Sequence, residues 1–216
     1  MEVSSIQKTE EVAYWLGLAQ ADGYFDIKHK ILRLELISFE LVKRFKEISE
    51  KHLGRIAKIR RDDKKRTWCY VIGIGKLMTF FKDMEFHFKD PPFPPEWIAR
   101  DIKFFGAYLA GLIDGDGHIQ IKRPKYPQCA IKIASSKKQI ELQKIIEETF
   151  KCSSYIDHRK QEKLRSKGYS HWFSLEFYVS KKTFEKVRQY IIPWIKLDYK
   201  RLRIEDFIKS RYAGVA

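Results

Sequence analysis

Two nine-residue stretches, WLGLAQADG at 15–23 and LAGLIDGDG at 109–117, decide the architecture of this chain. They align without a gap and lie 94 residues apart in a sequence of 216 residues. Each is followed by the same series: two β-rich segments, a charged amphipathic helix, two more β-rich segments and another helix. The sequence therefore predicts that one supersecondary unit occurs twice.

In the first unit, residues 10–22 are expected to form a helix, with Thr9 as its N-cap and Gly23 as a left-handed stop. Alternation of apolar and polar residues predicts strands over 24–30 and 31–39. We expect the rest of the unit to be a helix, two strands around a turn at 62–65, and a helix, over 40–52, 56–61, 66–74 and 76–84.

The second unit is expected to follow the same plan, with a helix ending at Asp116 and later elements over 118–123, 128–135, 137–150, 154–160, 170–179 and 181–191, then a last helix over 197–209. Four prolines between 87 and 97 predict a stiff linker, since proline forbids a helix interior or a central strand. The predicted fold class is α+β, built of two αββαββα units over residues 1–86 and 101–216 with the linker at 87–100.

Small residues spaced four apart lie on one face of each motif helix. They are Gly17 and Ala21 in the first motif and Gly111 and Gly115 in the second. Residues this small allow two helix backbones to approach closely, which here predicts contact across a pseudo-two-fold axis. A packing seam alone would explain the small residues, and it is compatible with a functional site at the same place.

Asp22 and Asp116 end the two motif helices, where the helix dipole is negative and an acidic side chain costs about 0.3–1 kcal/mol. If the helices pack at their small residues, the two carboxylates meet near the axis and repel unless a proton or a cation lies between them. A hard divalent cation such as Mg²⁺ suits paired oxygen ligands. We expect the two aspartates to act together as metal ligands, the alternative being that each only caps a turn.

Other polar residues give weaker signals. Asp114 takes the place that Gln20 has in the first motif, so we interpret it as a polar group at a helix end. The six histidines lack the spacing of a zinc site, and the three cysteines form no CxxC pair, so neither a structural zinc nor a disulfide is expected. The sequence contains no glycine-rich phosphate loop and no nucleophile elbow.

The stretch LAGLIDGDG at 109–117 differs by one residue from the motif that names the LAGLIDADG homing endonucleases, and WLGLAQADG at 15–23 resembles a more diverged copy. The resemblance covers nearly the whole chain, because the repeat spacing, the two units and the last helix agree with single-chain, two-motif members. It implies a DNA-binding saddle of two four-stranded antiparallel sheets and action as a monomer. It also implies Mg²⁺ as the cofactor, with Mn²⁺ as an alternative and Ca²⁺ as a non-catalytic substitute.

The resemblance also assigns residues. The penultimate motif residue is the catalytic, metal-binding acid of this family, which here is Asp22 and Asp116. The carbonyl just before it binds metal as well, which points to Ala21 and Gly115. Trp15 and Gln20 depart from the motif, which affects the packing but leaves the acid in place.

A basic residue often lies near the scissile phosphate in this family, and IPWIKLDYKRL at 192–202 resembles the segment that supplies it. Lys200 is our candidate, with Lys196 next, and Lys89 is a weaker choice for the first unit. The alternative for any of them is a solvated surface charge.

Strand residues that point away from the core are the expected readers of DNA, because the major groove admits β-ribbons and Arg, Lys and Gln pair with purine edges. In the first unit these residues, with the acidic Glu35 beside them, are Lys28, Lys30 and Arg33. In the second unit they are His118, Gln120, Lys122, Arg123, Gln128 and Lys132. Basic, turn-rich segments are expected to contact phosphates through Arg60, Arg61, Arg66, Arg159, Lys160 and Arg165, with a solvated loop as the alternative for each.

The charge supports a polyanionic partner, since 43 Lys and Arg face 28 Asp and Glu, a net charge of +15. The most apolar stretch, Phe104–Ile113, is far too short for a bilayer span, and no signal peptide is recognisable, so we expect no membrane partner. Composition predicts a cytoplasmic protein of a prokaryote or archaeon, with an organelle as the alternative. The absence of asparagine suggests a thermophilic source.

The function predicted from the sequence is site-specific cleavage of both strands of a long, pseudo-palindromic DNA target by metal-dependent hydrolysis. The resemblance adds short 3′ overhangs and a link to intron homing. Two alternatives stay open: an RNA-binding intron maturase, and a DNA-binding regulator that does not cut. Retention of both aspartates favours the nuclease, because splicing assistance needs no paired metal ligands.

Overall fold

The computed structural model describes residues 7–26, 28–29, 31–54, 57–88, 90–160 and 171–212. Its first unit contains three helices and four strands: α1 (Glu10–Asp22), β1 (Gly23–Asp26), β2 (Ile31–Leu36), α2 (Phe39–Leu53), β3 (Arg60–Asp62), β4 (Thr67–Gly73) and α3 (Ile74–Asp83). The linker that follows holds one short helix, α4 (Glu96–Ala99).

The second unit repeats this order with α5 (Ile102–Asp116), β5 (Gly117–Lys122), β6 (Gln128–Ser135), α6 (Ile140–Phe150), β7 (Ser154–Lys160), β8 (His171–Val179) and α7 (Phe184–Lys186). A π-helical turn (Val187–Ile191) and a 3-10 turn (Ile192–Trp194) extend α7, and α8 (Asp198–Tyr212) follows. The strands form two antiparallel sheets of the same order, β1-β2-β4-β3 and β5-β6-β8-β7. The predicted α+β fold of two αββαββα units is therefore confirmed.

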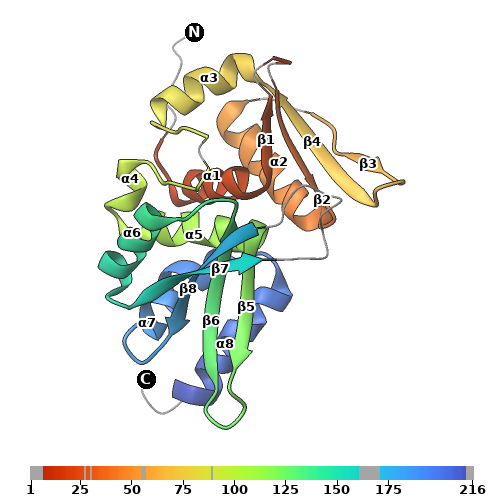
Figure 1. The fold of residues 1–216 in the computed structure, drawn as a ribbon. Coiled ribbons are helices and arrows are strands. Elements are labelled where there is room, and N and C mark those ends of the chain that lie inside the picture. Colours follow the sequence, from red (N-terminus) through yellow and green to blue (C-terminus); the bar gives the residue numbers. More distant parts are fainter. Residues whose placement is uncertain are drawn as a thin grey trace.

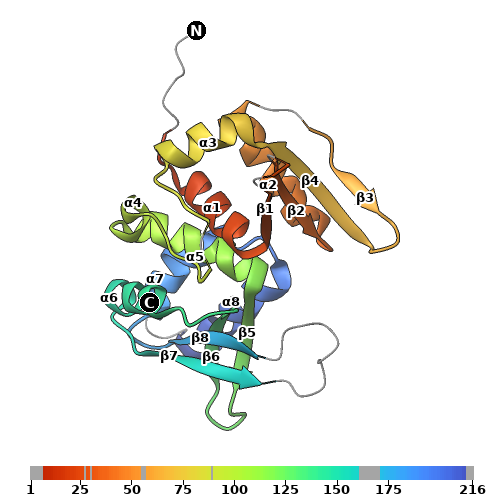
Figure 2. The ribbon, with the colours of Figure 1, turned by 45° about the horizontal axis from the view of Figure 1, so that its top comes forward.

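The helices α1 and α5 lie side by side at the centre, and the two sheets spread away from them on either side (Figures 1 and 2). All residues of α1 from Val12 to Ala19 are buried, because other elements surround this helix. The buried side chains of both units form one hydrophobic cluster. Among the helices of the described ranges, none has the length and apolar character that crossing a bilayer would require.

Glycines set the distance between the two central helices, as the motif spacing predicts. A methyl group at Gly17 would lie 2.1 Å from the carbonyl oxygen of Tyr108, and one at Gly111 would lie 2.3 Å from that of Tyr14. Both distances are far below van der Waals contact. The pair is symmetric, since Gly17 and Gly111 occupy the same place in the two motifs, and Tyr14 and Tyr108 each directly precede a motif.

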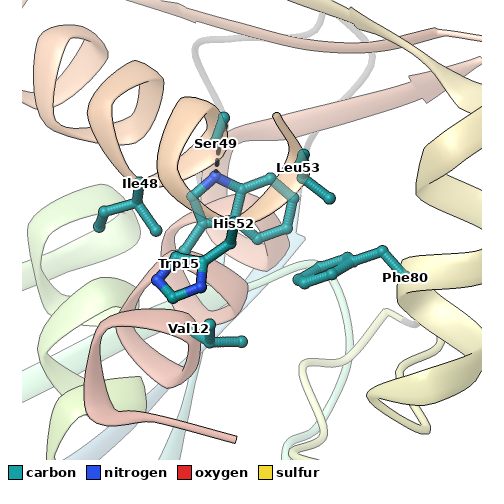
Figure 3. A pocket seen from close by; sticks show the side chains of 7 residues that line it. All are labelled: Val12, Trp15, Ile48, Ser49, His52, Leu53 and Phe80. Carbon is teal, nitrogen blue, oxygen red and sulfur yellow. Dashed lines mark hydrogen bonds between the residues drawn. The ribbon is translucent and has the colours of Figure 1, made fainter. Parts of the chain in front are cut away.

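Trp15, one of the departures from the motif, has a defined place in the core of the first unit (Figure 3). Its indole N–H donates to Ser49 Oγ at 2.8 Å, and the Ser49 hydroxyl donates to the Phe45 carbonyl at 2.6 Å. The ring stacks on Phe45 with centroids 4.6 Å apart and meets the edge of Phe80 at 5.3 Å. The space beside it leaves no room for a water molecule, so this is packing and not a ligand site.

Several element boundaries differ from the sequence prediction. Gly23 has φ −75° and ψ 131°, so it is extended and not left-handed. Glycine is needed there for space, because a methyl group would lie 2.1 Å from the Ala19 carbonyl oxygen as α1 turns directly into β1. The first strand ends at Asp26, and Lys28 lies in the turn that follows it.

The other differences have local causes. Helix α6 begins at Ile140 because the buried Gln139 is non-helical and donates through Nε2 to the Ile133 carbonyl at 3.2 Å. The strand predicted over 56–61 is regular only from Arg60, and β4 begins after Arg66, whose φ is 55°. The helix predicted over 181–191 is α-helical only at Phe184–Lys186.

Glu11 ties the start of α1 to α2 and supplies a prediction about stability. It accepts from Arg44 at 3.0 Å, from Lys51, and from His52 at 3.4 Å. The hydrogen bond from Lys51, opposed by burial and reinforced by His52 and Arg44, lowers the pKa of Glu11 to about 2. A lowered carboxyl pKa stabilises the folded state fully above the unfolded value of about 4.5, and this is lost as pH falls toward 2.

We therefore expect Glu11→Gln to lower the free energy of unfolding by roughly 1–2 kcal/mol at neutral pH. The difference from wild type should shrink as pH falls from about 4.5 towards 2, as followed by urea unfolding monitored by circular dichroism. Glu10→Gln is the matched control, because Glu10 is also in the first turn of α1 and has no ion pair within the described ranges. A Glu11 effect that is the same at every pH would contradict this account.

Candidate active site and nucleic-acid interface

The last residues of the two central helices are the predicted acids. Asp22 ends α1 and Asp116 ends α5, and each helix passes directly into the first strand of its sheet. The Asp22 carboxylate rests against α5, since a methyl group at Gly115 would lie 2.5 Å from Asp22 Oδ2 and 2.5 Å from Ala21 Cβ. The fold thus brings together Asp22, Asp116, Ala21 and Gly115, as the pairing of the motifs predicts.

The electrostatics of the two acids favour a bound cation. The surrounding protein raises the pKa of Asp22 to about 6, although Lys200 opposes the shift. Removal from water by the surrounding protein, together with the negative charges of Asp22 and Asp90, raises the pKa of Asp116 to about 7. The positive charge of Lys200 opposes this shift. Within the described ranges no hydrogen bond is donated to either carboxylate. Near neutral pH this pair carries its full charge only at a cost, which a cation between the carboxylates would offset.

The donor set fits a hard divalent cation. Asp22 is half-buried and Asp116 is exposed, so a ligand can reach them from solvent. The described residues contain no group of three or more His, Cys, Asp and Glu side chains that could hold a metal. The remaining ligands would therefore be backbone carbonyls, water or the oxygens of a bound anion, which is the way Mg²⁺ is usually held. The Gly115 carbonyl accepts one long hydrogen bond, 3.4 Å from Lys200 Nζ, and keeps a second lone pair.

Lys200 lies beside the acids, yet its ammonium is directed to the end of α5. It is buried and donates to the carbonyls of Ile113 at 2.6 Å, Asp114 at 2.8 Å and Gly115 at 3.4 Å. Burial lowers the pKa of Lys200, against the effect of Asp114, Asp22 and Asp116. The amine therefore neutralises the negative helix end and holds the Gly115 backbone in place.

Lys196, the second basic candidate, is oriented differently. Its Nζ donates to the Pro193 carbonyl at 3.3 Å and lies 5.7 Å from the centre of the Trp194 ring. Its backbone N–H donates to Asp114. Lys89, the candidate in the first unit, lies outside the described residues.

Asp114 is more than the polar helix end that the sequence suggests. It is almost fully buried, and it accepts from the Tyr14 hydroxyl at 2.8 Å and from the backbone N–H groups of Lys196 at 2.8 Å and Leu197 at 3.2 Å. It therefore fixes the segment that leads into α8 and carries Lys200. The equivalent contact on the other side of the axis is Tyr108 to Gln20, at 3.2 Å. This pair of contacts was not predicted from the sequence, and the signal that could have predicted it is a tyrosine directly before each motif, at Tyr14 and Tyr108.

An open cleft of about 660 Å³ reaches from the surface to Asp22 and to the end of α5. Asp22, Gly115 and Lys200 line it together with Glu35 and Thr67 from the first sheet. The exposed side chains of Ile37 and Tyr199 also line the cleft. Asp22 is therefore reached from the side on which the first sheet presents Glu35 and Thr67.

The strand faces follow the predicted alternation except at Ile121, which is expected on the buried face with the other isoleucines and is 45% exposed. Ile119, Ile131 and Ile133 are buried against the helices, so the other face of β5 and β6 carries His118, Gln120, Lys122, Gln128 and Lys132. In the first sheet, Leu32 and Leu34 are buried, and Arg33 and Glu35 lie on the outer face of β2. Arg123 follows β5 with a φ of 56°. Arg60 and Arg61 lie on β3, and Arg66 lies in the turn before β4.

The remaining basic candidates are placed unevenly. Arg159 lies on β7 and pairs with Asp157 at 2.6 Å, and Arg61 pairs with Asp63 at 2.7 Å. Lys28 is in a turn and exposed, not on a strand as predicted. Lys160 belongs to β7, but its side chain is outside the described part of the structure. Lys30 and Arg165 lie outside the described residues altogether.

Comparison with known proteins relates this geometry to a class. Residues 104–191 match the family model of the LAGLIDADG-like domain. The comparison with curated proteins gives no match. Among solved structures, full-length DUF199/WhiA from Thermatoga maritima is similar with a TM-score of 0.58 at 18% identity over 94% of this chain. This chain spans about 60% of the length of that protein.

Two endonuclease structures are also similar. The homing endonuclease I-WcaI bound to its DNA recognition sequence gives a TM-score of 0.59 at 14% identity, covering 92% of this chain and 88% of that one. I-DmoI in complex with DNA and Mn gives a TM-score of 0.52 at 14% identity, covering 84% of this chain and 96% of that one.

The chain therefore has the two-unit fold of the LAGLIDADG homing endonucleases, with a LAGLIDADG-like domain in its second unit. This confirms the resemblance and the fold class predicted from the two motifs. At these identities the solved structures establish the fold alone, and DUF199/WhiA shares it as well.

Proposed function

We propose that this protein is a site-specific endonuclease that hydrolyses both strands of double-stranded DNA with a divalent cation. The observation that carries the proposal is the meeting of Asp22 and Asp116 at adjoining helix ends, each with its pKa raised. Two antiparallel sheets flank this pair, and their outer faces include the basic residues Arg33, Arg60, Lys122 and Lys132, which suits a duplex lying across the molecule. Intron homing, short 3′ overhangs, a long pseudo-palindromic target and action as a monomer belong to the same proposal.

We assign cation binding and DNA binding to different residues. Asp22 and Asp116, with the carbonyls of Ala21 and Gly115, would hold Mg²⁺ or Mn²⁺. A cation bound there supplies Lewis-acid activation of water and stabilisation of the charge that develops on the phosphate. Lys200 keeps the Gly115 carbonyl in position through its hydrogen bonds to the end of α5. Outer-face residues such as Arg33 and Lys132 would contact the duplex.

The test is incubation of the full chain with a randomised duplex library, once with Mg²⁺ and once with EDTA. The proposal predicts that a minority of sequences is cut on both strands, and only with Mg²⁺. Absence of cutting with tight binding of structured intron RNA would instead support a maturase.

A DNA-binding protein that does not cut is the second candidate. The observation in its favour is the similarity to DUF199/WhiA, which is described by its LAGLIDADG domain and not as an endonuclease. It predicts that particular duplexes are enriched by binding from the same library and stay intact with Mg²⁺ and with Mn²⁺.

The raised pKa values also predict how cation binding depends on pH. Both carboxyls hold a proton below their pKa values of about 6 and about 7, so a cation must displace it there. We expect the affinity for Mn²⁺ to rise about tenfold between pH ~6 and pH ~8, measured by calorimetry without DNA. The Asp116→Asn variant should bind Mn²⁺ more weakly than wild type, and its affinity for Mn²⁺ should depend less on pH. An affinity that is independent of pH in the wild-type chain would contradict this assignment of the ligands.

A further inference from the structure

The outer face of the second sheet contains a completely buried carboxylate. Glu176 lies on β8 between Lys132 of β6 and Tyr155 of β7, its direct partners in the strand register. This face points away from the hydrophobic core, and yet the Glu176 side chain is 0% exposed. Burial of an acid on an outer face requires neighbours that cover it and satisfy it.

Those neighbours come from all four strands of the sheet. Glu176 Oε1 accepts from Lys122 of β5 and from the Tyr178 hydroxyl of β8 at 3.2 Å. Oε2 accepts from the Tyr155 hydroxyl of β7 and pairs with Lys132 Nζ of β6 at 3.3 Å. Although burial opposes the charged form, the bonds from Lys122 and Tyr155 hold the pKa of Glu176 below its usual value. One carboxylate thus connects β5, β6, β7 and β8.

The two lysines of this cluster differ in how many of their N–H donors are bound within the protein. Lys122 Nζ bonds to Glu176, to the Tyr155 hydroxyl at 3.1 Å and to the Tyr178 hydroxyl at 3.1 Å. An ammonium has three N–H donors, so every donor of Lys122 is used within the protein. Lys132 forms only an ion pair with Glu176, at 3.3 Å, and its side chain retains 12% exposure. The first sheet has no equivalent arrangement in its described part, since Glu35 keeps 18% exposure and bonds to Arg33, Lys65 and Thr67.

We propose that Glu176 is a specificity-determining positioning residue of the DNA-reading face, which withdraws Lys122 from phosphate contact and holds Lys132, Tyr155 and Tyr178 in one arrangement. A lysine freed from such a contact would bind phosphates of any sequence and add affinity without discrimination. The buried acid ties Lys122 into the protein and also takes the hydroxyl protons of Tyr155 and Tyr178. Lys132 is then the member of the cluster that keeps N–H donors for the duplex. This inference rests on the proposed binding of duplex DNA and is independent of whether the protein cuts.

The matched variants Lys122→Gln and Lys132→Gln test the proposal, because both remove one positive charge from the same face. The measurement is the salt dependence of binding to a duplex of mixed sequence in EDTA, using the full chain. Lys132→Gln should reduce the slope of log affinity against log salt by about 0.9, the value for one lost phosphate contact. Lys122→Gln should leave that slope at its wild-type value, although Lys122 is the more exposed of the two side chains.

Glu176→Gln supplies the complementary test. It should free Lys122 and make the slope steeper by about 0.9. It should also reduce about tenfold the preference for the best over the average member of a randomised duplex library, as expected from loss of one well-oriented contact. A purely structural role would lower the unfolding temperature and leave both the slope and the preference unchanged.

The outcomes separate this inference from the proposed function. Equal losses of slope for Lys122→Gln and Lys132→Gln, in chains that unfold like wild type, would overturn the inference and leave DNA binding in place. A wild-type chain that binds no duplex DNA would overturn both. The lysine variants decide the question even if Glu176→Gln does not fold, since each keeps the buried carboxylate and one of its lysine partners.

Discussion

Asp116→Asn is expected to bind target DNA as tightly as the wild-type chain and to cut it at least about 10³-fold more slowly. A cation at a phosphoryl oxygen contributes several kcal/mol to the rate, and each 1.36 kcal/mol corresponds to about tenfold. Asparagine keeps the size of the side chain and removes the charge that would hold the cation. Asp22→Asn should behave in the same way, because the two acids occupy equivalent helix ends.

The measurement pairs a gel-shift titration in EDTA with a cleavage time course in Mg²⁺. Asp206→Asn is the matched control, since Asp206 is exposed on α8 and the substitution makes the same change in charge. It should cut like wild type. A loss of binding in Asp116→Asn equal to its loss of cutting would contradict the separation of the two roles.

Substitution at the central helix contact should have the largest effect on stability. Gly17→Ala would place a methyl group 2.1 Å from the Tyr108 carbonyl oxygen, and Gly111→Ala would place one 2.3 Å from that of Tyr14. The clashing atoms are backbone, so relief requires α1 and α5 to separate along the axis that joins the two units. We expect each substitution to lower the free energy of unfolding by about 3 kcal/mol or more.

Urea unfolding of the purified variants is the direct measurement, and the cleavage rate of whatever remains folded is the second. Gly54→Ala is the control, because a methyl group there has nothing within 4 Å and meets only the cost of a left-handed residue at φ +59°. That cost is about 1 kcal/mol. If Gly17→Ala lowered the free energy of unfolding no more than Gly54→Ala, the conclusion that the two helix backbones are in close contact at Gly17 would be wrong.

The parts of this fold that the sequence predicts well are those decided by local pattern and by repetition. The motif helices and the strands β5 and β6 follow from short-range periodicity, and the two equal units follow from the repeat. Thr9 and Ser38 cap their helices through side-chain bonds to Val12 and Leu41, as such residues commonly do. The convergence of Asp22 and Asp116 followed from small residues at equivalent positions.

The parts that the sequence left open depend on contacts between distant residues. Asp114 is buried by Tyr14, which lies 100 residues away, so its role as an anchor for the segment before α8 had no local signal. Lys200 was predicted near the acids, but only the fold shows its amine directed at the end of α5. Glu176 has no unusual neighbour in the sequence, and its burial arises from lysines and tyrosines on four strands. The boundaries at Gly23 and Gln139 likewise depend on backbone packing that propensity does not describe.

The central claim is that Asp22 and Asp116 form one paired centre that cuts both strands, and sequencing both ends of every product from a randomised duplex library tests it most directly. The account predicts cuts in Mg²⁺ at fixed positions on the two strands, offset to leave short 3′ overhangs and absent with Asp22→Asn, Asp116→Asn or EDTA. A library that is bound but shows no metal-dependent ends, or cuts that persist in both variants, would contradict it.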